Sequence, residues 1–92
     1  MKTVKTWKID RTNRTAEWLE KVAYPTIEKL MGKGKTKVTF TGLSANLDID
    51  FAINEIRGFY LNPKYNEEEN SLSVNWYAPE LDFEAVYNVL AH

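Results

Sequence analysis

The sequence predicts an α+β fold: a single small domain whose three- to four-stranded sheet has two or three helices packed on it. Two patterns predict this class. Between residues 15 and 31 apolar residues recur every three or four positions, as in an amphipathic helix, and between residues 35 and 42 they alternate with polar residues, as in a strand. The 92 residues suffice for one hydrophobic core. We therefore expect residues 1–92 to form one domain with the order β-α-β-(α)-β-β-α.

The first three elements follow from propensity and period. Residues 2–9 are rich in β-branched side chains and predict a strand. Residues 15–31 predict a helix that Pro25 kinks or divides, because proline lacks the N–H that the helix needs, and Gly32 ends it. Residues 35–42 then predict a half-buried strand with a basic outer face.

Residues 46–58 fit both a strand and a helix. Their apolar residues alternate with Asp48 and Asp50, as in a strand, but they also line one face of a helix. In a helix the two aspartates would lie at the positive end of the macrodipole, Arg57 at the negative end and Gly58 just beyond it. The sequence leaves the choice open, and these terminal residues favour the helix.

The remaining chain predicts a hairpin and a last helix. Residues 59–65 indicate a short strand that Pro63 confines to a sheet edge, residues 66–70 a polar turn, and residues 71–76 a strand. Residues 79–90 begin with Pro-Glu, which is typical of a helix start. The packing face expected of this last helix consists of Phe83, Val86, Tyr87 and Leu90.

The residue types provide little for catalysis. Cysteine is absent, which excludes disulfides, thiolate chemistry and cysteine-based zinc sites, and the single histidine is the last residue, His92. The segment 32–36 resembles a phosphate-binding loop, but it has Lys29 where that loop needs glycine and it precedes a strand rather than a helix. We expect no enzyme, no cofactor and no metal site.

Charge is divided along the chain. Residues 1–40 contain ten lysines and arginines against four acidic residues, whereas residues 41–92 contain two against nine. Segregated charge and amphipathic aromatic side chains are typical of binding surfaces. No apolar run resembles a signal peptide or a membrane span, so we expect the protein in the cytoplasm.

The leading functional hypothesis is a protein-binding module of inhibitor or adaptor type, compatible in size with bacterial or phage proteins, that acts by occupying a partner surface. Its acidic half would compete with nucleic acid for a basic groove on the partner. The expected binding residues are Trp18, Tyr24, Tyr65, Glu67, Glu68, Glu69, Asp82 and Glu84. The alternative is a nucleic-acid-binding protein that uses a basic face of residues 2–37, with Lys33, Lys35 and Lys37 as contacts. Contact between oppositely charged faces would also allow a homo-oligomer.

Overall fold

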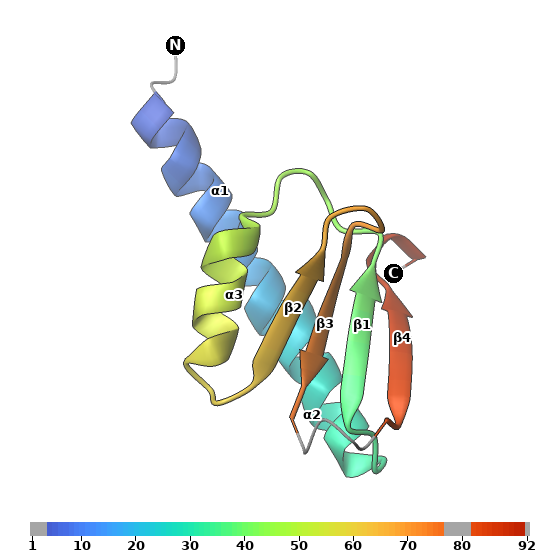
Figure 1. Ribbon diagram of the computed structural model, residues 1–92. Coiled ribbons are helices and arrows are strands. Elements are labelled where there is room, and N and C mark those ends of the chain that lie inside the picture. Colours follow the sequence, from blue (N-terminus) through green and yellow to red (C-terminus); the bar gives the residue numbers. More distant parts are fainter. Residues whose placement is uncertain (1–3, 77–81, 92) are drawn as a thin grey trace.

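The computed structural model describes residues 4–76 and 82–91, and its four-stranded sheet lies beside a long helical rod, as Figure 1 shows. The rod consists of α1 (Val4–Trp18), a π-helical turn η1 (Leu19–Ala23) and α2 (Tyr24–Gly32). The other elements are β1 (Lys37–Thr41), α3 (Ile49–Arg57), β2 (Asn62–Asn66), β3 (Ser71–Asn75), β4 (Glu84–Asn88) and a 3-10 turn η2 (Val89–Ala91). The α+β class and the four-stranded sheet are therefore as predicted, although the element order differs at both ends of the chain.

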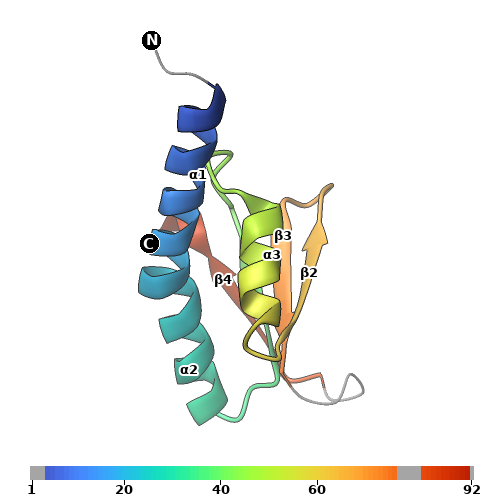
Figure 2. The ribbon, with the colours of Figure 1, turned by 90° about the vertical axis from the view of Figure 1, so that its left-hand side faces the viewer.

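The sheet is mixed, with the strand order β2-β3-β1-β4. β3 pairs antiparallel with both β1 and β2, whereas β4 pairs parallel with β1. The helices cover one face of this sheet and leave the other face open (Figure 2). The core lies between the covered face and the helices, and its largest fully buried side chains include Phe40, Ile56 and Leu72.

The prediction of a strand at residues 2–9 is wrong, because the described part of that segment belongs to α1. The rod continues past Pro25, but the hydrogen-bond pattern changes one turn earlier. The backbone N–H of Tyr24 donates to the carbonyl of Leu19, five residues back, and Pro25 then occupies the first turn of α2. A π turn at this point allows the helix to continue although Pro25 has no backbone N–H to donate.

The helix prediction for residues 46–58 is confirmed by α3. The side chain of Asp48 caps the first turn by accepting a hydrogen bond from the backbone N–H of Phe51 at 3.1 Å. Arg57 lies in the last turn, where its charge complements the macrodipole. The hairpin of β2 and β3, with Pro63 on the edge strand, is also as predicted.

The prediction of a helix at residues 79–90 is wrong for the described residues, which form β4 and η2. Its first residues, Pro79 and Glu80, lie outside the described ranges. In β4, Ala85 and Tyr87 lie opposite the core residues Val38 and Phe40 of β1. The ring of Tyr87 packs edge-on against Phe40 at 5.9 Å between ring centres. Strand pairing beside β1 therefore outweighs the helical spacing of the apolar residues.

None of the described helices has the length and apolar character needed to cross a membrane.

Candidate interaction surfaces

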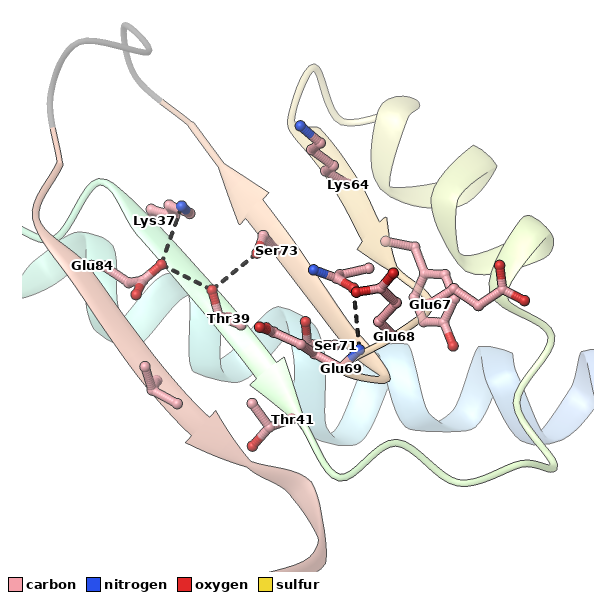
Figure 3. Close-up of a pocket in the computed structure, with 13 residues that line it drawn as sticks. Lys37, Thr39, Thr41, Lys64, Glu67, Glu68, Glu69, Ser71, Ser73 and Glu84 are labelled. Carbon is pink, nitrogen blue, oxygen red and sulfur yellow. Dashed lines mark hydrogen bonds and ion pairs between the residues drawn. The ribbon is translucent and has the colours of Figure 1, made fainter.

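The open face of the sheet is almost entirely polar. The side chains of alternate residues on each strand point to this face, because their neighbours on the strand point into the core. They are Asn62, Lys64, Asn66, Ser71, Ser73, Asn75, Lys37, Thr39, Thr41, Glu84, Val86 and Asn88. Part of this face forms an open concavity of about 720 Å³, whose rim includes the turn between β2 and β3 (Figure 3).

A polar network links three strands across the floor of this concavity (Figure 3). Glu84 accepts a hydrogen bond from Thr39 Oγ1 at 3.0 Å and pairs with Lys37 Nζ at 3.2 Å. Thr39 Oγ1 also lies 3.0 Å from the hydroxyl of Ser73. The hydrogen bond from Lys37, followed by that from Thr39, lowers the pKa of Glu84 below its ordinary value. The network therefore joins a basic residue from the first part of the chain to an acidic residue from the second.

The acidic turn lies at the rim of the same concavity. Glu67, Glu68 and Glu69 are exposed there (Figure 3), and the turn is fixed by Asn70, whose side-chain amide donates to the carbonyl of Leu43 at 2.8 Å. The fold thus brings the acidic turn and Glu84 to one surface, as the predicted binding set requires. Lys37 and Lys64 share that surface, so its charge is mixed rather than acidic. Asp82 is exposed and lies outside this concavity.

The three predicted aromatic contact residues differ in accessibility. Trp18 is only 9% exposed and packs edge-on against Phe40 at 5.4 Å, so its prediction as an exposed anchor is wrong. Tyr24 is half-buried and packs edge-on against Phe59 at 5.0 Å between ring centres. Burial, followed by the charges of nearby acidic residues, raises the pKa of Tyr24. Tyr65 is half-buried on β2, and its hydroxyl donates to the side chain of Asn70 at 2.9 Å.

Of the three lysines of the nucleic-acid hypothesis, Lys33 and Lys37 line different depressions of the surface. Lys37 lies on the open face, where it pairs with Glu84. Lys33 lines a groove between α2 and β4, on the helix side of the sheet. Because residues 4–18 form a helix and not a strand beside β1, the basic residues of that segment do not extend the basic strand face.

Exposed apolar side chains occur in and next to β4, which the sequence analysis missed. Three side chains on and around this strand are exposed: Phe83 at 57%, Val86 at 66% and Leu90 at 75%. The helical spacing of these residues concealed them, since it placed them on a buried helix face. The alternation of Ala85 and Tyr87 with Glu84, Val86 and Asn88 was the signal that could have revealed a strand.

The two edges of the described sheet are constructed differently. On β2, Pro63 and Lys64 discourage the addition of another strand, and α3 packs beside it. The residues of β4 are Glu-Ala-Val-Tyr-Asn, which include neither proline nor lysine. No described strand pairs with its outer side. An unprotected edge with apolar side chains is a template for strand addition.

A groove of about 340 Å³ runs between this edge and α2. Its lining combines the apolar residues of both elements with two lysines. The lining residues are Pro25, Thr26, Lys29, Leu30, Lys33, Ala85, Val86 and Tyr87. The groove therefore has room beside the strand for the side chains of an added chain.

Comparison of this chain with protein-family models, with curated proteins and with solved structures found no match in any of the three. Within the described ranges, histidine and acidic side chains form no group of three that could hold a metal ion.

Proposed function

We propose that this protein is a small binding module that captures an extended segment of a partner protein and adds it as a strand to the outer edge of β4. The observation that carries the proposal is the unpaired edge of β4, with the exposed Val86 at its centre, in a sheet whose other edge carries Pro63 and Lys64. The protein would act by occupying that segment of its partner, as expected for an inhibitor or adaptor.

Backbone hydrogen bonds and side-chain contacts both support this mode of binding. In an edge strand, alternate residues direct their N–H and C=O groups outward, where an added strand can pair with them. Val86 lies at the centre of β4 and exposes two thirds of its surface to the solvent. Covering Val86 removes apolar surface from water, which favours association by about 25 cal/mol per Å² before the costs of ordering are subtracted.

The test is selection of random peptides on the immobilised protein, followed by mapping of each selected peptide with backbone amide NMR. We expect the peptides to shift and protect the amides of β4. Val86→Lys should abolish binding, because a charged side chain at the strand centre opposes pairing. Ile9→Lys serves as the matched control, since Ile9 is similarly exposed but lies on α1. Failure to select any peptide, or selection of peptides that map away from β4, would contradict the proposal.

The placement of Lys33 and Lys37 gives no support to the alternative of nucleic-acid binding, because Lys33 lines the groove beside α2 whereas Lys37 lines the concavity of the open face and pairs with Glu84. The proposed competition with nucleic acid through the acidic turn also remains a hypothesis. Its test is charge reversal at Glu67, Glu68 and Glu69, and unchanged partner binding would exclude it.

A further inference from the structure

Two exposed lysines line the groove beside β4. Lys29 lies in the last turn of α2, Lys33 is the C-cap residue four positions later, and both line the groove. Neither lysine pairs with a carboxylate among the described residues. Their charges are thus available to a bound chain.

We infer that the captured segment is acidic on one face and apolar on the other, with two aspartates or glutamates separated by one apolar residue. This inference rests on the proposed function, and it names the chemistry of the partner. Side chains of an added strand alternate between the two faces of the sheet. Those on the helix side would meet Lys29 and Lys33, and those on the open side would meet Val86.

The spacing of the lysines agrees with this pattern. Four residues along a helix correspond to a rise of about 6 Å. Two residues along a strand correspond to about 7 Å, so alternate side chains of a strand recur at nearly the same interval. Acidic residues at positions i and i+2 of the added strand would recur at an interval similar to that of the two lysines, and the residue between them would lie on the face of Val86.

A second copy of this chain is a poorer occupant of the same edge. Two-fold pairing of β4 with itself would place the α2 helices of both copies on the same face of the joined sheet. Lys29 and Lys33 of both copies would then line one groove, and like charges repel. An acidic segment neutralises these lysines instead, so charge complementarity favours a different partner chain.

The experiment measures fluorescence anisotropy with three labelled heptapeptides: Thr-Val-Glu-Val-Glu-Val-Thr and the versions with glutamine or lysine in place of both glutamates. We expect the glutamate peptide to bind about tenfold more tightly than the glutamine peptide, and its affinity to fall as salt is raised. The double variant Lys29→Glu with Lys33→Glu should reverse the preference and bind the lysine peptide best. The matched control is Arg14→Glu with Lys64→Glu, which makes the same charge change at exposed sites outside the groove.

The outcomes separate this inference from the proposed function. Equal binding of all three peptides, with loss of binding in Val86→Lys, would overturn the acidic preference but leave strand addition intact. If no peptide binds and random selection also fails, both are wrong. Sedimentation of the protein alone provides the remaining test: a dimer that Val86→Lys converts to monomer would show that a second copy occupies the edge, which also overturns the inference.

Discussion

Replacement of Thr15 by valine should destabilise the junction between α1 and α3. Thr15 is fully buried, and its hydroxyl donates to the carbonyl of Arg11 at 2.8 Å and accepts from the backbone N–H of Asp48 at 2.7 Å. Asp48 is the N-cap of α3, so this hydroxyl fixes the start of one helix to the side of another. Valine retains the shape of threonine but leaves the Asp48 N–H without its acceptor.

An unpaired buried donor costs about 1–3 kcal/mol, so we expect Thr15→Val to lower the free energy of unfolding by about 2 kcal/mol. For a chain of this size, that loss corresponds to a fall in Tm of roughly 8–16 °C. Thr15→Ser is the matched control, since it retains the hydroxyl and loses one methyl group, which costs about 0.8 kcal/mol. The assay is urea denaturation followed by tryptophan fluorescence. If the valine variant were as stable as the serine variant, the hydroxyl would not hold this junction.

Three further predictions concern the sheet and its polar network. Gly42→Ala should lower stability by more than about 1 kcal/mol, because Gly42 has φ +67° and an added Cβ would lie 2.7 Å from a side-chain oxygen of β4. Gly34→Ala is its control, with φ +80° and open space around the Cβ, and equal losses in thermal melts would refute the clash. Phe40→Leu should cost about 2 kcal/mol in urea denaturation, since two edge-on ring contacts are lost, and a loss below about 0.5 kcal/mol would show that these contacts contribute little. Glu84→Gln should make the free energy of unfolding depend less on acidic pH. The pKa of Glu84 in the folded protein lies below its ordinary value of 4.5. Ionised Glu84 therefore stabilises the fold above that pH, and this stabilisation is lost as the pH falls through the lowered pKa. Unfolding curves of the two proteins across this acidic range should therefore converge, and parallel curves would contradict the role of the Lys37 pair.

The basic and acidic parts of the sequence do not form separate basic and acidic surfaces. Lys37 comes from the basic part of the chain and Glu84 from the acidic part, but the parallel pairing of β1 with β4 places them side by side. Sequence distance cannot reveal such a pair, because strand register determines it. The same limit explains the missed groove, which is lined by Lys29 and Lys33 at the end of α2 and by a strand more than 50 residues further along the chain.

Several elements could be predicted because their signals are local. The alternation in β1, the capping aspartate and terminal charges of α3, and the proline of β2 each act within a few residues. The exposure of the acidic turn could be predicted for the same reason. The burial of Trp18 could not, because it depends on contact with Phe40, which lies in a different element.

The sequence by itself therefore determined the α+β class, the strands β1 and β3 and the absence of cysteine chemistry, and it favoured the helix α3 without excluding a strand there. Only the tertiary structure decided the secondary structure at the two ends of the chain. No proline or glycine interrupts residues 4–23, so extending α1 costs only propagation of an existing helix, while the sheet position beside β1 is taken by β4. Residues 84–88 fit a helix by period and a strand by alternation, and the unfilled edge of β1, which buries Ala85 and Tyr87 partly against the core, selects the strand.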